Sequence, residues 1–430
     1  MAAWKQDLIA EPSAERRRSV CVITSGHLST CPRMLKAADA LDAAGYHVRV
    51  VSANYVDWAS RLDTAVRKTA AWEWTAVDYS GASGRSLWLR SGLRTRFAQA
   101  LARGVGPSRV PQVLAVPAFS RVHAELVREA LRDAADLYYG GTAGGLSVAA
   151  ECGRRTGKPY ALDLEDFHSA EMMDSPEARF RHALIERVER DVLGGATFLT
   201  AAGTGIANAY SRKYGVEPVS INNTFALPIQ PPSLEVSPGR TLKFYWFSQT
   251  IGPGRGLEDV IEATALAGIP CELHLRGNPA GGYCDALKSL IERRNPGLRL
   301  VVLPAASPDQ MVDLAIPHDL GLALEPREPL NKDLCLSNKA LTYLLAGLPV
   351  VLTATQGQSP LARDLGDAAI MYPPGDVPAL AAGLRGWSEN KSLLARAKAA
   401  AWDAAVRRWN WDHPLEKGAL LNAVDRALRT

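Results

Sequence analysis

The most informative stretch of the chain is Phe244-Tyr-Trp-Phe-Ser-Gln-Thr-Ile-Gly-Pro-Gly-Arg-Gly256, which runs into Leu257-Glu-Asp-Val-Ile-Glu-Ala263. Its apolar start is typical of a buried strand, whereas Leu257, Val260 and Ile261 recur at the spacing of one helix face. The glycines between these two patterns indicate a tight turn. The sequence therefore predicts a strand, a turn and a helix here, the unit from which parallel α/β sheets are built.

The turn is a candidate anion site. Gly252, Gly254 and Gly256 let the backbone approach a ligand closely, and the helix N-terminus presents free N–H groups with a partial positive charge. Arg255 adds a planar cation that matches phosphate oxygens. An ordinary turn with a surface arginine remains an alternative. A dinucleotide site is disfavoured because the next strand ends in Arg276-Gly277 and not in an acidic residue.

The bulk composition narrows the class of protein. A chain of 430 residues is long enough for two or three domains, and its net charge of +4 does not by itself indicate a nucleic-acid partner. The sequence has no apolar run long enough to span a membrane and no secretory signal, so we expect a cytoplasmic protein. Six scattered cysteines predict reduced thiols and neither a disulfide nor a metal site: Cys21, Cys31, Cys152, Cys271, Cys284 and Cys335.

Strand–helix alternation runs through both halves of the chain. In the first half it predicts a long helix near 119–134, a less regular stretch at 54–117, and strands at 20–25, 47–52, 136–139, 160–164, 198–200 and 219–223. After the strand that begins at Phe244, it predicts a final helix at 414–428 and strands at 271–275, 298–303, 320–324 and 349–353. A proline-rich stretch between the halves predicts a linker. Two parallel α/β domains would place a ligand in the cleft between them.

A second candidate anion site lies about eighty residues beyond the first. Ser337 is a suitable N-cap for a short helix over 338–346, which Gly347 would end. Lys339 falls in the first turn of this helix, near the positive end of its dipole, where a cation is normally unfavourable. A bound anion would relieve that conflict, so we expect Lys339 to serve function.

The two segments together resemble a known family. Arg255-Gly-Leu-Glu-Asp-Val-Ile-Glu-Ala263 and Ser337-Asn-Lys-Ala-Leu-Thr-Tyr-Leu-Leu-Ala-Gly-Leu-Pro-Val-Val351 are similar to the nucleotide-sugar domain of GT-B glycosyltransferases, in particular the retaining, family-four-like enzymes (glycosyl transferases group 1). The opening Gly26…Pro32-Arg33 resembles the first unit of their acceptor domain. Arg408-Trp-Asn-Trp-Asp412 and the last helix resemble the segment that crosses back to it.

The resemblance implies an α/β fold of two doubly wound, Rossmann-like domains that face a central cleft. The expected bounds are 1–228 for the acceptor domain, 229–239 for the linker, 240–408 for the nucleotide-sugar domain and 409–430 for the crossing helix. No cofactor and no metal ion are expected, because GT-B sites neutralise the departing diphosphate with cationic side chains and helix N-termini.

The resemblance also implies roles for individual residues. The expected catalytic residues are Arg255, Lys339 and His168. The expected donor-binding residues are Gln249, Gly252, Gly254, Gly256, Glu325, Ser337, Asn338 and Thr342. The expected cleft residues on the acceptor side are Gly26, His27, Arg33 and Asp166.

The chain departs from the family pattern at four positions. Ser248-Gln249 stands where such enzymes usually carry Arg, and Arg255 stands where they carry Lys. Leu334 and Thr342 occupy the positions of the usual pair of glutamates. A hydroxyl at Thr342 would bind a ribose more weakly than a carboxylate. Glu325 is a candidate to supply the missing carboxylate.

His168 follows an expected strand, with Glu165, Asp166 and Glu171 around it. Carboxylates can raise the pKa of a histidine or orient its ring. A retaining transfer needs no strong enzymic base, whereas an inverting one would use Asp166 or His168. For His168, a loop histidine with local bonds is the alternative, and for His27 a local role is the more probable one.

Residues 87–103 are amphipathic and basic. Such a segment could lie on an anionic membrane or hold a polyanionic acceptor, and a solvated helix face is the alternative. We therefore expect a cytoplasmic glycosyltransferase, at the inner membrane surface if this segment binds lipid. Its partners would be a nucleotide-sugar donor and a glycan, glycolipid or small-molecule acceptor, with no nucleic acid. The alternatives are a nucleotide-sugar epimerase or hydrolase on the same fold, and a two-domain binding protein without chemistry.

Overall fold

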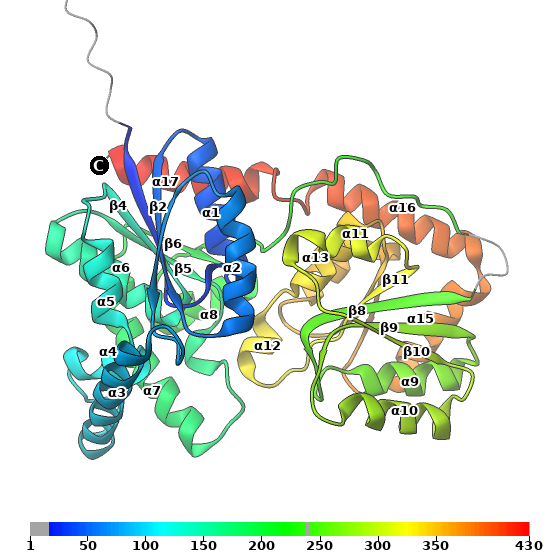
Figure 1. Ribbon diagram of the computed structural model, residues 1–430. Helices are drawn as coiled ribbons and strands as arrows, with labels where there is room; N and C mark the ends of the chain where they lie inside the picture. The colour runs from blue at the N-terminus through cyan, green and yellow to red at the C-terminus, as the bar shows by residue number, and fades with distance from the viewer. Residues whose placement is uncertain (1–16, 237–240, 430) are drawn as a thin grey trace, which may run out of the picture.

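The computed structural model describes residues 17–236 and 241–429, which form two α/β halves (Figure 1). The expected bounds that fall on 1–16, 237–240 and 430 lie outside the described residues. The first half contains a seven-stranded sheet in the order β3-β2-β1-β4-β5-β6-β7, and the second a six-stranded sheet in the order β10-β9-β8-β11-β12-β13. Neighbouring strands are parallel in both sheets. In each half the strand order reverses beside the first strand, β1 or β8, so this is where a ligand crevice is expected.

The elements of the first half alternate almost throughout. They are β1 (Ser19–Thr24), α1 (Pro32–Ala43), β2 (His47–Asn54), α2 (Asp57–Thr69), β3 (Glu73–Asp78), α3 (Arg85–Val105), α4 (Gln112–Phe119), α5 (His123–Ala130), β4 (Leu137–Gly141), α6 (Thr142–Thr156), β5 (Tyr160–Leu164), α7 (Pro176–Val192), β6 (Phe198–Ala201), α8 (Thr204–Tyr214) and β7 (Val219–Ser220).

The second half repeats this pattern. Its elements are β8 (Leu242–Ile251), α9 (Leu257–Ala267), β9 (Cys271–Pro279), α10 (Tyr283–Arg294), β10 (Arg299–Leu303), α11 (Met311–Ala315), β11 (Leu320–Ala323), α12 (Leu330–Leu334), α13 (Asn338–Leu345), β12 (Val350–Thr353), α14 (Ser359–Leu365), β13 (Ala369–Tyr372), α15 (Val377–Glu389) and α16 (Lys391–Arg407). A final helix, α17 (Ala419–Arg429), follows a π-helical turn at Pro414–Gly418.

Each sheet is buried on both faces. In β1, Val20 and Val22 belong to one apolar core, and Cys21 and Ile23 belong to the core on the opposite face. Side chains of successive strand residues point to opposite faces, so a continuous apolar run fills both cores at once. This explains why the central strands read as unbroken apolar stretches in the sequence.

Five expectations about elements are corrected. In place of the long helix expected near 119–134, the structure has the shorter α5 (His123–Ala130). The preceding helix α4 ends at Phe119, because Pro117 lacks an N–H near its end and Ser120 adopts an extended backbone. The stretch at 54–117 is regular and contains the edge strand β3. A second edge strand, β13, was not expected. The strand expected at 219–223 is only two residues long, and the final helix begins as a π-helical turn.

The end of the chain returns to the first half, where Figure 1 shows α17 beside α1. Leu420 and Val424 of α17 lie in the core that contains Val20 and Val22. The crossing is fixed by the fully buried Glu416, whose oxygens accept hydrogen bonds from Asn222 and Arg408 of the two halves, the Arg408 Nη1–Oε1 distance being 2.6 Å.

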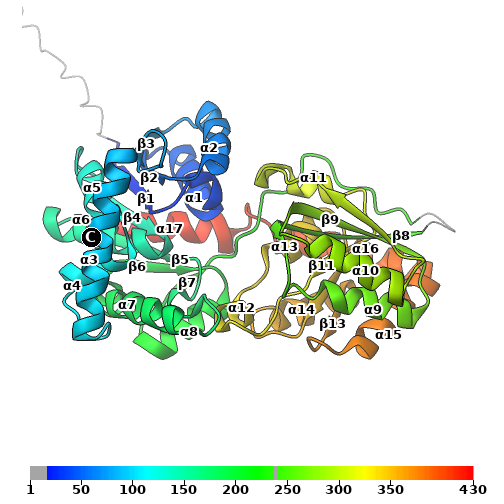
Figure 2. The same cartoon turned by 60° about the horizontal axis from the view of Figure 1, so that its bottom comes forward.

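A second connection between the halves is α12. Its Leu334 is buried among the core residues of the first half. Gly205 in α8 permits this approach, because a Cβ there would lie 2.2 Å from the Leu334 carbonyl oxygen. Figures 1 and 2 both show α12 between the two sheets. The loop after β11 is therefore held against the first half.

Candidate functional site

The glycine-rich turn lies at the point where the strand order of the second sheet reverses. Gly254 and Gly256 have left-handed backbones, with φ of 71° and 67°, and α9 begins directly after Gly256. A Cβ on Gly256 would lie 3.0 Å from Cβ of Leu324, at the end of the neighbouring strand β11. Both the backbone conformation and this close approach require glycine. The turn therefore places the α9 N-terminus beside the residues that follow β11.

The residue after Leu324 is a buried carboxylate, Glu325. Its Oε1 accepts hydrogen bonds from Lys339 Nζ at 2.7 Å and from Ser337 Oγ at 3.0 Å, and Lys332 Nζ lies 3.7 Å from Oε2. These contacts hold the Glu325 pKa far below its usual range despite burial. Oε2 has no hydrogen-bond partner within the described residues. Since a buried carboxylate oxygen is costly to leave unpaired, this atom is a candidate acceptor for a ligand hydroxyl.

Lys339 and Arg255 lie close enough to affect each other. Burial lowers the Lys339 pKa, Glu325 opposes that shift, and the positive charge of Arg255 contributes to it. No hydrogen bond or ion pair engages the Arg255 guanidinium within the ranges the structure covers. An anion between the two cations would balance both charges. The structure thus brings together these two expected catalytic residues.

The other expected donor residues are placed unequally. Gln249 is exposed near the end of β8, and Asn338 is exposed at the first turn of α13. Ser337 occupies the N-cap of α13, but its hydroxyl donates to Glu325 and does not cap the helix. Thr342 is corrected: it has no exposed surface, and its hydroxyl donates to the Asn338 carbonyl at 3.0 Å, so a ribose does not reach it in this conformation.

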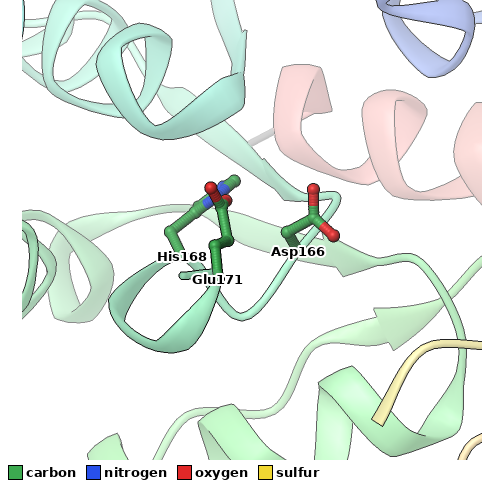
Figure 3. Close-up of side chains that lie close together, drawn as sticks. All are labelled: Asp166, His168 and Glu171. Atoms are coloured by element: carbon green, nitrogen blue, oxygen red, sulfur yellow. The ribbon is translucent and has the colours of Figure 1, made fainter. Parts of the chain in front are cut away.

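The loop after β5 gives the first half its polar cluster (Figure 3). Asp166, His168 and Glu171 have candidate ligand atoms within 4.8 Å of one another. The Glu171 carboxylate, the partner of His168 Nδ1, raises the imidazole pKa to about 9, with Asp166 and Glu189 adding to the shift. A doubly protonated imidazole has no lone pair for a metal ion. With its pKa raised in this way, His168 forms an ion pair with Glu171, and Asp166 adds a second carboxylate to the cluster. His168 Nε2 is buried with no hydrogen-bond partner in the described chain.

Glu165 was noted in the sequence only as a neighbour of His168, yet it is the most perturbed carboxylate of this loop. Burial and the charge of Asp166 raise its pKa to about 8, although Arg33 opposes the shift. No side chain in the described ranges hydrogen-bonds its carboxylate. A carboxyl group that keeps its proton near neutral pH can donate to a ligand and later accept a proton.

The loop after β1 differs from the expectation. His27 Nδ1 pairs with Asp63 Oδ2 at 2.7 Å, and Nε2 accepts from the backbone N–H groups of Tyr55 and Val56 at 3.0 Å. The Gly26 carbonyl accepts from the Ala53 N–H. Both ring nitrogens of the buried histidine are used within the fold, so His27 is corrected from a cleft residue to a local structural one.

The expectation that Arg33 is a cleft residue is corrected for the same reason. Its guanidinium, almost fully buried, donates to both oxygens of Asp163, from Nε at 2.7 Å and from Nη2 at 2.5 Å. Nη1 donates to the Ile221 carbonyl, also at 2.5 Å. This bidentate pair connects α1 with β5 and the end of the first half. It leaves no direction from which a diphosphate could bind the arginine.

The two polar clusters meet across the halves through residues that the sequence did not single out. Asn331 of α12 donates to Asp166 Oδ1 at 2.7 Å and accepts from the Phe167 N–H at 2.7 Å. Cys335 Sγ lies 3.6 Å from the same Asp166 oxygen. These contacts place Asp166 at the boundary between the halves. No local pattern around Asn331 could have indicated this partner, which is 165 residues away.

Three solved structures show how this architecture compares with known proteins. HepE of Anabaena, in complex with UDP and glucose, matches with a TM-score of 0.66 at 16% identity, over 96% of this chain and 100% of that one. Sucrose-phosphate synthase of Thermosynechococcus elongatus matches with 0.66 at 13% identity, over 96% and 98%. TarM of S. aureus, in complex with fondaparinux, α-GlcNAc-glycerol and UDP, matches with 0.62 at 8% identity, over 96% and 100%. The chain has the GT-B fold.

These similarities establish the architecture. The matches cover 96% of the GT-B chain. No family model and no curated protein sequence matches it. In this GT-B chain the second half contributes the glycine turn, Glu325 and Lys339 to the candidate site. The first half contributes the loop after β5.

Proposed function

We propose that this GT-B protein is a glycosyltransferase that moves a sugar from a nucleoside-diphosphate sugar to an acceptor, with retention and without a metal ion. The single observation that carries the proposal is the convergence of Arg255 and Lys339 with the N-termini of α9 and α13 at the reversal point of the second sheet. Cations and helix N-termini stabilise a departing diphosphate without a metal. The UDP in the HepE and TarM complexes agrees with such a donor.

Each residue of the second half has a distinct proposed role. Arg255 contacts the diphosphate, whose negative charge grows as the bond from the anomeric carbon to its oxygen breaks. Lys339 shares this charge and holds Glu325 in place. The unpartnered Oε2 of Glu325 accepts a hydrogen bond from a hydroxyl of the donor. A site that is already charged and ordered before the reaction lowers the barrier without reorganisation.

The first half would present the acceptor, a glycan, a glycolipid or a small metabolite. His168, in the loop after β5, would donate its Nε2–H, which has no partner among the described residues, to a substrate oxygen. In a retaining transfer the leaving diphosphate takes the acceptor proton, so no enzymic base is needed. A cytoplasmic site of action, at the inner membrane surface for a lipid-linked acceptor, would fit this role.

Ligand binding is the first test. Thermal-shift measurements with UDP-, GDP-, ADP- and TDP-sugars should raise Tm for at least one donor. Lys339→Met should abolish that shift, whereas Lys288→Met, a solvent-exposed lysine on α10, should preserve it. The absence of any shift across the donor panel would contradict the proposal.

Turnover is the second test. With the stabilising donor, release of the nucleoside diphosphate should persist in EDTA, and NMR of the product should show the same anomeric configuration as the donor. Sustained epimer formation without an acceptor would instead support an epimerase. A donor that binds and is never consumed with any acceptor would support a binding protein.

A further inference from the structure

The long helix α3 (Arg85–Val105) carries a row of exposed apolar side chains. At every fourth position from residue 89 to residue 105 it has a large apolar residue, and Leu93 and Phe97 at the centre of the row are 67% and 66% exposed. The full row is Leu89, Leu93, Phe97, Leu101 and Val105. The opposite side of the helix packs on the fold through Ser91, Thr95, Ala98 and Ala102. The apolar row therefore belongs to the outer face.

The charge around this row has one sign. Between Asp78 and Glu125 the chain contains seven arginines and no acidic residue: Arg85, Arg90, Arg94, Arg96, Arg103, Arg109 and Arg121. Arg94 pairs with Glu125, and Arg103 pairs with Glu177 on α7. Arg85, Arg96 and Arg90 are exposed on α3, and no carboxylate of the described residues pairs with them. At helical spacing, Arg96 flanks one side of the row and Arg90 the other, and Arg85 continues the row at its N-terminal end.

The helix lies at the outer end of the first half. Figures 1 and 2, related by a turn of 60°, both show α3 on the side of the first half that is remote from the second. A helix of this length extends about 30 Å. No helix in the described ranges is long and apolar enough to cross a bilayer. An exposed apolar row with flanking arginines is the pattern of a helix that lies in the plane of a membrane interface.

We propose that α3 docks the protein on an anionic lipid bilayer, with the row 89–105 in the headgroup–acyl boundary and the flanking arginines on lipid phosphates. The arginines favour a bilayer over a second copy of the chain, because two α3 helices face to face would bring like charges together. The proposal is independent of the reaction, since it rests only on α3. Docking in this orientation leaves the second half free of the bilayer.

Vesicle flotation tests the docking. Wild-type protein should float with phosphatidylcholine vesicles that contain about 30% phosphatidylglycerol, and floating should fall at least tenfold on pure phosphatidylcholine or in about 0.5 M NaCl. Leu93→Gln/Phe97→Gln should lose binding at every salt concentration. Arg90→Gln/Arg96→Gln should weaken binding and flatten its salt dependence.

Matched variants in the second half control for general effects. Leu266→Gln/Val406→Gln replaces two apolar residues of comparable exposure, and Arg293→Gln/Arg363→Gln replaces two exposed arginines. Both should float like wild type, and circular dichroism should show all variants folded. Equal flotation on neutral and anionic vesicles, or none at all, would overturn the proposal. So would a wild-type dimer in sedimentation that Leu93→Gln/Phe97→Gln converts to a monomer.

Discussion

The loop after β1 and the loop after β8 occupy equivalent places in the two sheets. They differ in whether their cationic side chains have partners within the fold. Around the first loop, Arg33 and His27 have every polar atom engaged by Asp163, Asp63 or the backbone. Around the second, Arg255 has no such partner among the described residues. Of the two arginines, therefore, only Arg255, which no carboxylate of the described residues pairs with, is a candidate to bind a ligand anion.

The largest effect that would test this comparison is on stability. Arg33→Met should destabilise the protein by about 3–5 kcal/mol, because it leaves the almost fully buried Asp163 carboxylate without its partner. Chemical denaturation would measure this loss. Arg109→Met, a change at an exposed arginine of the same half, should cost less than about 0.5 kcal/mol. Similar values for the two variants would show that the Arg33 pair is not structural.

The next effect is on turnover and concerns the opposite loop. Arg255→Ala should lower kcat by more than about tenfold, equivalent to about 1.4 kcal/mol of transition-state stabilisation, with an unchanged Tm. The reason is that Arg255 has no hydrogen-bond or ion-pair partner among the described residues, so the variant loses only the positive charge at the diphosphate. Steady-state kinetics on the stabilising donor would measure it. Wild-type turnover in Arg255→Ala would remove the residue from the site.

A third effect is a change in the pH dependence of stability caused by Glu165. Because its pKa is raised to about 8 in the folded state, the folded protein keeps a proton that the unfolded chain releases near the ordinary glutamate pKa of 4.5. The contribution of Glu165 to the free energy of unfolding is therefore fully present below about pH 4.5, and it is lost as pH rises through about 8. Tm should fall less between pH 5 and pH 8 in Glu165→Gln than in wild type.

Two comparisons make that measurement specific. His168, with a pKa raised to about 9, contributes in the same direction at slightly higher pH, so part of the wild-type slope should persist in Glu165→Gln. Glu292→Gln, a change at an exposed carboxylate of α10, should leave the slope as it is. An unchanged slope in Glu165→Gln would mean that Glu165 is already ionised at neutral pH.

The sequence predicted the central strands well, because a parallel strand buried on both faces is a continuous apolar run. It missed β3 (Glu73–Asp78) and β13 (Ala369–Tyr372), which lie at the sheet edges and are only partly buried. β13 is only four residues long, and β3 mixes apolar with polar residues, so neither gives the long apolar run that marks a central strand. The break between α4 and α5 was missed because the apolar spacing continues across it.

The site was predictable where function depends on local chemistry. The glycines before α9 made the turn a candidate anion site, and in the structure Gly256 of this turn lies against Leu324, next to Glu325, which pairs with Lys339. Roles that depend on distant partners were not predictable: the pairing of Arg33 with Asp163 spans 130 residues. Thr342 illustrates a third case, since only the packing of α13 shows that its hydroxyl faces inward.

The return of α17 to the first half has a consequence for synthesis of the protein. The first strand, β1, emerges early from the ribosome, but the core around Val20 and Val22 is completed by Leu420 and Val424. A nascent chain must therefore keep that surface uncovered until translation is almost finished. Folding of the first half is thereby coupled to the synthesis of α17. A chain that stops after α16 would lack the helix that completes the apolar core of the first half.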